Sequence, residues 1–319
     1  MPVKIIFFGT PEFAVPSLVR LINAGYEITA VVTQPDRQAG RGRQVRSCPV
    51  KLEAEKNGIR VLQPQRVRDD DFIRELEVFN PSAIVVVAYG QILPSRILHL
   101  PNYGCINVHA SLLPDYRGAA PINWAIVNGE KKTGISIMFM DEGMDTGPVL
   151  LKKEMDILDD DTAGSLSLKL AEAGAQLLIS ALEGIEKGTL IPRPQAGKVS
   201  YAPPLKKTDA LIAWSKTAKE LFQFIRGMNP WPGAYTFLEG KRIRILKGAP
   251  VETEGEHNQA HREEDAGMIV TATRNELIVS TGSGKIAILE LQPSGKPVMP
   301  VRSFLQGRTL REGMRFHDS

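Results

Sequence analysis

The first half of the chain alternates short apolar runs with longer amphipathic stretches. Continuous apolar runs are typical of strands in a sheet that is covered on both faces, and apolar positions three and four apart indicate helices. The expected strands are residues 4–9, 27–33, 83–88 and 106–108, and the expected helices are 13–23, 50–57, 70–79 and 121–128. This strand–helix alternation predicts a Rossmann-like α/β domain with a mainly parallel sheet.

The pattern changes after Gly134. Residues 135–140 and 149–157 are expected to form two strands close enough to pair, separated by a loop rich in acids and glycine. A long amphipathic helix is expected at 162–187, with Asp160 and Asp161 at its start, where unpaired amides and the helix dipole favour carboxylates.

Residues 189–204 contain four prolines in sixteen positions and little periodicity, which is typical of a semi-rigid linker. Beyond the linker we expect one helix, 217–227, and then short strands separated by glycines, a pattern typical of a small OB-like β-barrel. The predicted organisation is a catalytic domain at 1–189, a linker at 190–207 and a barrel domain at 208–319. The acidic stretch 252–265 is expected to be a mobile loop.

The composition is ordinary for a globular protein, with 43% hydrophobic and 24% charged residues among 319 and a net charge of +3. The longest apolar run, residues 83–89, is far shorter than the ~20 residues that span a bilayer. Cys48 and Cys105 lie in unrelated contexts without metal-ligand spacing. We therefore expect a cytoplasmic protein with reduced thiols and no membrane segment.

Polar residues occur where the strand ending at residue 109 reaches the carboxyl edge of the sheet, which is where open parallel sheets bind ligands. Asn107 and His109 are two positions apart and therefore point to the same side of the strand. Asp145 lies in the loop 141–148, which we expect to open at the same edge. A structural histidine and an ordinary hairpin loop remain alternative interpretations, although they do not explain why the residues share one edge.

An amide, an imidazole and a carboxylate without a serine or cysteine nucleophile favour direct acyl transfer to an amine. The Asn107 amide and a protonated His109 can donate hydrogen bonds to a carbonyl oxygen as it becomes an oxyanion. A neighbouring carboxylate orients the imidazole and stabilises its protonated form. The attacking atom then comes from the substrate, and an α-amino group needs only positioning and removal of a proton. We therefore predict that Asn107, His109 and Asp145 are catalytic, without a metal.

A second candidate segment, residues 34–43, combines glycines with arginines and follows a strand at the same sheet edge. It is either a solvated loop or a flexible arm that orders on a phosphate backbone. The glycine-containing segment 9–13 also follows a strand, but it lacks the G-x-G-x-x-G spacing and contains Pro11, so a dinucleotide site is not expected there.

These segments together resemble the methionyl-tRNA formyltransferase family of folate-dependent enzymes. The resemblance rests on residues 9–14, on 34–37 with 40–42 (including Arg41), on Asn107 through Gly118, and on Asp141 through Pro148. It continues at residues 209–214 and 225–234, so it covers nearly the whole chain. The Asn-x-His pair and the downstream aspartate alone would indicate only the wider group of folate-dependent formyltransferases.

The resemblance implies 10-formyltetrahydrofolate as the formyl donor and the methionine amine of initiator Met-tRNA as the acceptor. It also implies that Asn107 and His109 polarise the formyl oxygen, while Asp145 orients His109 and helps to remove the amine proton. By position, the folate would contact Val86, Val87, Ala88, Tyr89, Gly90, Gln91, Ile92, Ser111, Leu112, Leu113, Pro114, Asp141, Glu142, Gly143 and Met144. The tRNA would contact the arm and one basic face of the barrel domain through Arg37, Arg41, Arg43, Lys206, Lys207, Lys241, Arg242, Arg244 and Lys247. We expect a monomer.

Two sibling activities stay open at this point: a sugar-nucleotide N-formyltransferase, and the hydrolase-like domain of formyltetrahydrofolate dehydrogenase. The arginine-rich arm distinguishes them from the tRNA enzyme, because neither sibling needs to enter an RNA stem. A third alternative is a non-catalytic tRNA-binding module, against which the intact set of Asn107, His109 and Asp145 argues.

Overall fold

The computed structural model describes residues 3–39, 44–251, 265–307 and 310–317, and the chain forms two compact units. The first unit comprises residues 1–121, 132–156 and 167–202. The second unit comprises 122–131, 157–166 and 203–319, so two short segments of the expected catalytic domain group with the C-terminal part. The domain boundaries expected at residues 189 and 207 stay a prediction.

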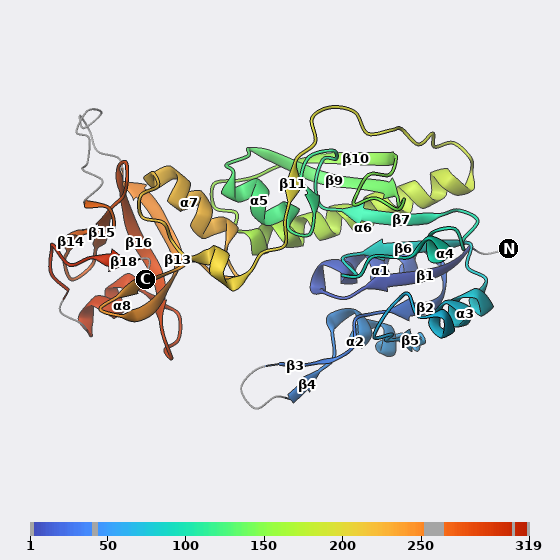
Figure 1. Ribbon diagram of the computed structural model, residues 1–319, viewed down its shortest axis with the longest axis horizontal. Coiled ribbons are helices and arrows are strands. Elements are labelled where there is room, and N and C mark those ends of the chain that lie inside the picture. The colour runs from blue at the N-terminus through green and yellow to red at the C-terminus, as the bar shows by residue number, and fades with distance from the viewer. Residues whose placement is uncertain (1–2, 40–43, 252–264, 308–309, 318–319) are drawn as a thin grey trace. The chain divides into compact units, whose positions relative to one another are not determined.

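A sheet with the strand order β10-β9-β7-β6-β1-β2-β5 forms the centre of the first unit (Figure 1). Its parallel strands are β1 (Lys4–Gly9), β2 (Glu27–Val32), β5 (Val61–Leu62), β6 (Ala83–Val87) and β7 (Cys105–His109). At the other edge, β9 (Lys132–Phe139) pairs antiparallel with β7 and with β10 (Val149–Asp156). The prediction of a Rossmann-like, mainly parallel sheet is therefore confirmed.

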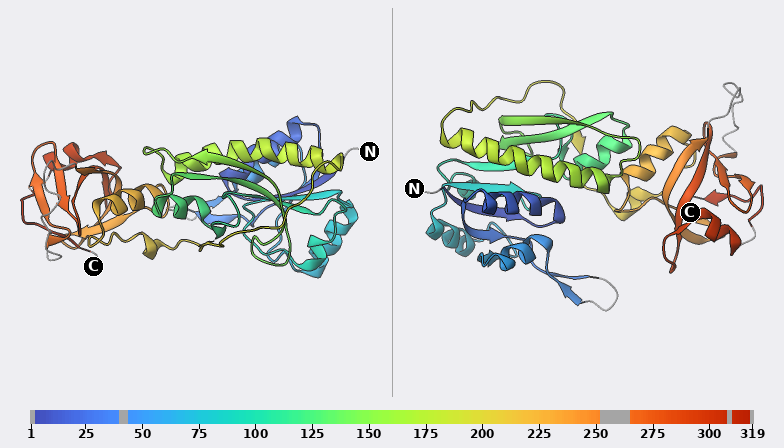
Figure 2. Two further views of the ribbon diagram at one scale, coloured as in Figure 1. Left: turned by 90° about the horizontal axis from the view of Figure 1, so that it is seen from above. Right: turned by 180° about the vertical axis from the view of Figure 1, so that it is seen from behind.

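Helices lie on both faces of this sheet, as Figure 2 shows. They are η1 (Glu12–Ala14), α1 (Val15–Asn23), α2 (Pro49–Lys56), α3 (Asp70–Phe79), α4 (Ser95–Leu98) and the greater part of α6 (Ala163–Glu186). On one face, Phe72 and Leu76 of α3 belong to the same core cluster as Ile6 and Phe8 of β1. These apolar contacts are the main source of the unit's stability, because burial removes apolar surface from water.

The segment after β2 differs from the flexible loop predicted from the sequence. The two sides of this segment form a β-hairpin, in which β3 (Arg37–Ala39) pairs antiparallel with β4 (Gln44–Arg46). Strands of three mainly polar residues carry no hydrophobic pattern, which is why the sequence did not predict them. Arg41 and Arg43, both expected to contact tRNA, lie outside the described residues.

A polar cluster anchors the base of this hairpin. The Asp36 carboxylate accepts a hydrogen bond from Lys51 Nζ at 2.6 Å and another from Gln63 Nε2 at 3.0 Å. These two bonds, that from Lys51 first, hold the pKa of Asp36 below its ordinary value. The Asp36 carboxylate is therefore ionised at neutral pH and ties the hairpin to α2 through Lys51.

The expected linker is bonded to the first unit up to residue 202. β11 (Tyr201–Ala202) pairs parallel with β8 (Arg117–Gly118). β8 is the next strand in the chain after β7, which carries Asn107 and His109. Arg193 and Val149 form an antiparallel bridge, with N–H to O distances of 2.8 Å in both directions. These short pairings bring the segment alongside the loops that follow β7 and β9.

The second unit is built on a curled antiparallel sheet with the order β14-β15-β16-β13-β12-β18. Its strands are β12 (Tyr235–Leu238), β13 (Lys241–Val251), β14 (Ile269–Ala272), β15 (Leu277–Ser280), β16 (Lys285–Pro293), β17 (Met299–Pro300) and β18 (Phe316–His317). The backbone amide of Phe316 donates to Gly267 O at 2.8 Å, and that of Ile269 donates to Met314 O at 2.7 Å. These bonds join the two ends of the sheet, which confirms the predicted OB-like barrel.

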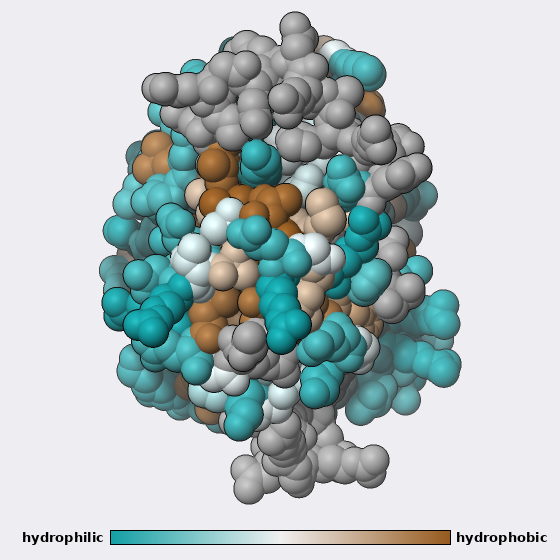
Figure 3. All heavy atoms as spheres, turned by 90° about the vertical axis from the view of Figure 1, so that its left-hand side faces the viewer, coloured by the Kyte–Doolittle hydropathy of each residue, from teal (hydrophilic) through white to brown (hydrophobic). Residues whose placement is uncertain are grey.

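Helical elements complete this unit: α5 (Pro121–Val127, from residue 122), η2 (Lys207–Ala210), α7 (Ala218–Gly227) and α8 (Val301–Gln306). Inside the barrel, Trp214 stacks on Phe316 with ring centroids 5.5 Å apart. On the face that Figure 3 turns to the viewer, apolar side chains gather near the centre and polar ones surround them. Residues 252–264 of the expected mobile loop lie outside the described residues.

Across the described part of the chain, no helix combines the length and the apolar character that a membrane crossing requires.

Candidate active site

Asn107, His109 and Asp145 converge at the carboxyl end of β7. The carboxylate of Asp145 lies between the other two side chains: its Oδ2 is 3.6 Å from His109 Nδ1, and its Oδ1 is 3.5 Å from Asn107 Nδ2. His109 is 6% exposed and Asp145 is 17% exposed at their side chains. Both contacts are longer than a tight hydrogen bond, as is common for catalytic groups before substrate binds.

The tautomer of His109 follows from its second contact. Its Nε2 is 3.0 Å from the backbone carbonyl oxygen of Tyr116. A carbonyl oxygen only accepts hydrogen bonds, so Nε2 carries a proton and donates it to Tyr116 O. The remaining nitrogen, Nδ1, faces Asp145 at 3.6 Å, which is too long for a tight hydrogen bond. Nδ1 is therefore the ring nitrogen that a substrate can reach.

Backbone groups hold Asp145 in an uncommon conformation. Its φ is +53°, in the left-handed region that residues with a side chain adopt only when their surroundings require it. Its Oδ2 accepts a hydrogen bond from the backbone amide of Gly118 at 2.8 Å. Gly118 has a φ of +120°, and a Cβ there would lie 2.6 Å from Ala202 O, so only glycine fits at this donor.

Gln195 was missed in the sequence, where it appeared as one residue of a proline-rich linker. Its Nε2 donates to Asp145 O at 2.7 Å and to Gly147 O at 2.9 Å. Its Oε1 accepts from Nε and Nη2 of Arg117, at 3.1 and 2.7 Å. No periodicity marks such a residue, and only the folded chain shows that its amide lies beside the Asp145 loop.

The residues expected to contact folate lie at the end of β6 and in three loops of the first unit, after β6, after β7 and between β9 and β10. Val87, Tyr89, Ser111 and Leu113 are each at most 2% exposed, so a ligand would meet their backbone and not their side chains. By contrast, Ile92 is 88% exposed and Met144 is 63% exposed. Exposed apolar side chains of this size provide a surface for a flat ring.

Two residues of the expected folate set, Asp141 and Glu142, line a cavity of about 340 Å³. Its other walls come from α4 and the residue after it, from the start of β7, and from the end of β9: Leu98, His99, Gly104, Cys105, Phe139 and Met140. The cavity has the size of small-molecule sites, and its lining combines apolar side chains with carboxylates. It therefore lies beside the Asp141–Pro148 loop that carries Asp145.

Cys105 does not supply a nucleophile at this cavity. Its thiol is buried and donates weakly to Ile97 O and Leu98 O, at 3.5 and 3.7 Å. Burial raises the pKa of this thiol to about 12, so the reactive thiolate is not populated at neutral pH.

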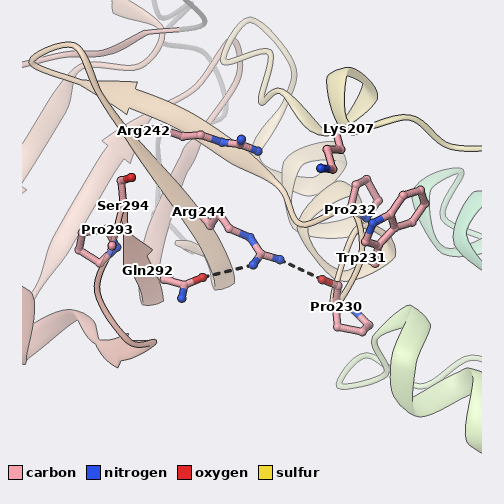
Figure 4. A pocket seen from close by; sticks show the side chains of 10 residues that line it. Lys207, Pro230, Trp231, Pro232, Arg242, Arg244, Gln292, Pro293 and Ser294 are labelled. Carbon is pink, nitrogen blue, oxygen red and sulfur yellow. Dashed lines mark hydrogen bonds between the residues drawn. The ribbon is translucent and has the colours of Figure 1, made fainter. Parts of the chain in front are cut away.

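The second unit has a cavity of about 450 Å³ that is lined by cations (Figure 4). Three of the residues expected to contact tRNA lie there, namely Lys207, Arg242 and Arg244, together with the exposed side chain of Trp231. Among the described residues, no acidic one lines it. Of the other expected tRNA contacts, Lys206 is the N-cap of η2, Lys241 and Lys247 lie in β13, and Arg37 lies in β3.

Comparison with known proteins decides the family. Residues 3–182 match the family described as formyl transferase, and residues 204–309 match the formyl transferase C-terminal domain. The methionyl-tRNA formyltransferase of Thermodesulfovibrio yellowstonii is 50% identical over 310 residues, which are 97% of this chain and 97% of that protein. The chain belongs to the methionyl-tRNA formyltransferase family.

Solved structures with lower identity share the fold. A variant of HypX from Aquifex aeolicus is 17% identical with a TM-score of 0.66, over 98% of this chain and 49% of that chain, so the chain spans about half the length of HypX. WlaRD, a sugar 3N-formyl transferase, is 20% identical with a TM-score of 0.64, over 93% of this chain and all of that chain. At these identities the likeness shows the fold alone, whereas the identity to methionyl-tRNA formyltransferases favours the tRNA activity over the sugar-nucleotide one.

Proposed function

We propose that the chain transfers a formyl group from 10-formyltetrahydrofolate to the α-amino group of methionine on initiator Met-tRNA, as a monomer in the cytoplasm. The observation that carries this proposal is the convergence of Asn107, His109 and Asp145 in a member of this family. The reaction forms one C–N bond to the amine and breaks the C–N bond to the folate, so no external oxidant or reductant is needed.

The roles follow from where each polar atom lies. The amide of Asn107 donates a hydrogen bond to the formyl oxygen as the amine attacks and the oxygen gains negative charge. His109 donates a second from Nδ1, which lies 3.6 Å from the Asp145 carboxylate and makes no tight hydrogen bond with it. Asp145 lies beside the ring, orients it through its charge and accepts the proton that the attacking amine loses, directly or through one water. This proton then passes to the folate nitrogen as the C–N bond to that nitrogen breaks.

The folate is proposed to bind with its flat ring in the cavity beside Asp141 and Glu142. A pterin carries several ring N–H groups, for which the carboxylates and backbone carbonyls of this loop are acceptors. Ile92 and Met144 offer exposed apolar surface to the rest of the folate. The formyl-bearing nitrogen would then lie towards Asp145, on the same loop.

The tRNA is proposed to bind through the hairpin of β3 and β4 and through the basic residues of the second unit. Their charges attract RNA phosphates and release condensed counterions, which makes affinity depend on salt. A net charge of +3 is too small to indicate a partner. The support comes from three basic residues, Lys207, Arg242 and Arg244, that line one cavity.

The test is a formylation assay with labelled 10-formyltetrahydrofolate and four acceptors side by side: initiator Met-tRNA, elongator Met-tRNA, free methionine and an amino-sugar nucleotide. We expect rapid transfer to initiator Met-tRNA and far slower transfer to the other three. Preferential transfer to the amino-sugar nucleotide would overturn the proposal, and so would hydrolysis of the folate without any acceptor.

A further inference from the structure

The cationic pocket of the second unit has properties beyond a general attraction for RNA. Arg244 is clamped in place, because its Nη2 donates to Pro230 O at 2.9 Å and its Nη1 donates to Gln292 Oε1 at 3.2 Å. The guanidinium of Arg242 is held over the ring of Tyr235, 3.7 Å from its centroid. In Figure 4 the charged ends of Arg242 and Lys207 point toward one another. Among the residues that the structure describes, no ion pair is formed by either of them.

An aromatic ring lies beside these cations. Trp231 is flanked by Pro230 and Pro232, whose fixed φ angles stiffen the backbone, and it is 53% exposed. Leaving a tryptophan in water costs free energy that burial against a partner would recover. The pocket therefore combines anchored positive charge with an open aromatic face.

We propose that this pocket binds one unpaired nucleotide of the RNA substrate, with its base stacked on Trp231 and its phosphate between Lys207 and Arg242. This deepens the proposed function and rests on it. A nucleotide joins a flat aromatic base to an anion at a fixed spacing, and single-stranded RNA binds proteins through these two contacts together. A paired nucleotide has both faces of its base covered, so the partner is an unpaired position.

The experiment compares Trp231→Ala, Trp231→Phe and Arg242→Ala with the control Lys219→Ala, which removes an exposed cation from α7 of the same unit. The dissociation constant of Met-tRNA at fixed salt is expected to rise about tenfold for Trp231→Ala and Arg242→Ala, and about twofold or less for Trp231→Phe, because phenylalanine can still stack. The formylation rate at tRNA concentrations well below the dissociation constant should fall by the same factor as the affinity. Lys219→Ala should change neither quantity.

If the wild-type protein formylates Met-tRNA and Trp231→Ala binds the tRNA with unchanged affinity, the pocket proposal is overturned and the proposed function is not. If the wild type fails to formylate Met-tRNA, the proposed function fails, and the same variants are then titrated with a short unpaired oligoribonucleotide. Weaker binding of that probe by the variants supports the pocket. Binding of inorganic phosphate that competes with the oligoribonucleotide equally in wild type and Trp231→Ala would mean an anion site without stacking, and would overturn the proposal. Thermal melting of each variant separates these outcomes from misfolding.

An independent observation concerns Gln195, whose amide joins the two backbone segments that fix Asp145. One segment is the loop containing Asp145 and Gly147, whose carbonyls accept from Gln195 Nε2. The other is Arg117-Gly118, which supplies the amide bonded to the Asp145 carboxylate and the guanidinium bonded to Gln195 Oε1. All four bonds are between 2.7 and 3.1 Å. The geometry assigns to Gln195 the role of a positioning residue that holds Asp145 in its left-handed conformation.

The variants Gln195→Ala and Gln195→Glu test this role against Arg193→Ala, a neighbour on the same segment whose contact with Val149 is made by backbone and is kept. Turnover is expected to fall about tenfold to a hundredfold in both Gln195 variants, with the KM for tRNA within twofold, since a misplaced catalytic group costs rate and not binding. Glutamate keeps the acceptor for Arg117 but turns a carboxylate oxygen towards two carbonyls, so it should not rescue. Arg193→Ala should be as active as wild type.

A double-variant cycle distinguishes positioning from a general effect on the fold. If Gln195 acts through Asp145, then Gln195→Ala should add less than twofold to the defect of Asp145→Ala, because the group that it positions is already gone. A full additional tenfold loss in the double variant would show that Gln195 acts elsewhere. Wild-type turnover in Gln195→Ala would also overturn the role.

Discussion

Asp145 in the first unit and Arg242 in the second are both charged side chains in proposed sites, but their surroundings differ. The Asp145 carboxylate is 17% exposed and contacts a side-chain amide, an imidazole and a backbone amide. The Arg242 guanidinium rests on one aromatic ring beside an open cavity. A group that moves a proton must be held within a few tenths of an ångström, whereas a group that attracts a phosphate needs mainly charge and access.

The largest effects on turnover are expected at the site of Asp145, where the side chains are held in place. Replacing His109 by alanine should lower the turnover about a thousandfold, because the proton at Nδ1 and its hydrogen bond to the developing oxyanion are both lost. Asn107→Ala should cost about a hundredfold, since one donor to the oxyanion remains. Steady-state kinetics with saturating Met-tRNA measures both losses. A smaller loss for His109→Ala than for Asn107→Ala would reverse the assigned order of the two donors.

A smaller effect is expected for charges on the barrel. The affinity for tRNA should fall steeply with added salt. Lys241→Ala or Lys247→Ala should each reduce the slope of log affinity against log salt concentration by about 1. Lys56→Ala serves as a control, because this first-unit lysine already pairs with Glu53 at 3.2 Å. Binding isotherms at several salt concentrations give the slopes. A flat dependence in the wild-type protein would mean that phosphate contacts do not drive binding.

The smallest effect concerns stability at the base of the hairpin. The pKa of Asp36 is lowered by its bond to Lys51, so its contribution to folding is present above the unfolded-state pKa and is lost as pH falls through the folded-state pKa. Asp36→Asn should therefore destabilise the protein by about 1 kcal/mol at pH 7 and progressively less on acidification below about pH 4. Thermal melts across this range measure the difference. An equal deficit at acidic and neutral pH would assign the effect to geometry and not to charge.

The sequence predicted the parts of the molecule that hydrophobic periodicity governs. The strands β1, β2, β6 and β7 and the helix α3 follow from apolar runs and helical spacing, and the sheet they form brings Asn107 and His109 to one edge. The loop of Asp145 was expected to open at the same edge, but β9 is antiparallel to β7 and its last residue, Phe139, pairs with Ile106. The loop therefore begins beside the amino end of β7, and Asp145 still contacts Asn107 and His109.

The sequence did not predict contacts that depend on single polar atoms. β8 and β11 are two residues each and carry no pattern, and Gln195 lies among prolines that indicate an irregular segment. The left-handed conformation of Asp145 was also not predicted, because only glycine adopts it routinely and aspartate adopts it only occasionally. Trp231 gave no signal either, since whether an aromatic residue is buried or exposed depends on the fold around it.

The central claim is that Asp145 serves the chemistry and not the binding of tRNA. Its most direct test is single-turnover formylation of initiator Met-tRNA by Asp145→Ala, with the dissociation constant of the tRNA measured on the same preparation. The account predicts a rate at least a thousandfold below wild type and a dissociation constant within twofold of it. A variant that keeps a tenth of the wild-type rate, or one whose defect disappears when the tRNA concentration is raised, would contradict the account.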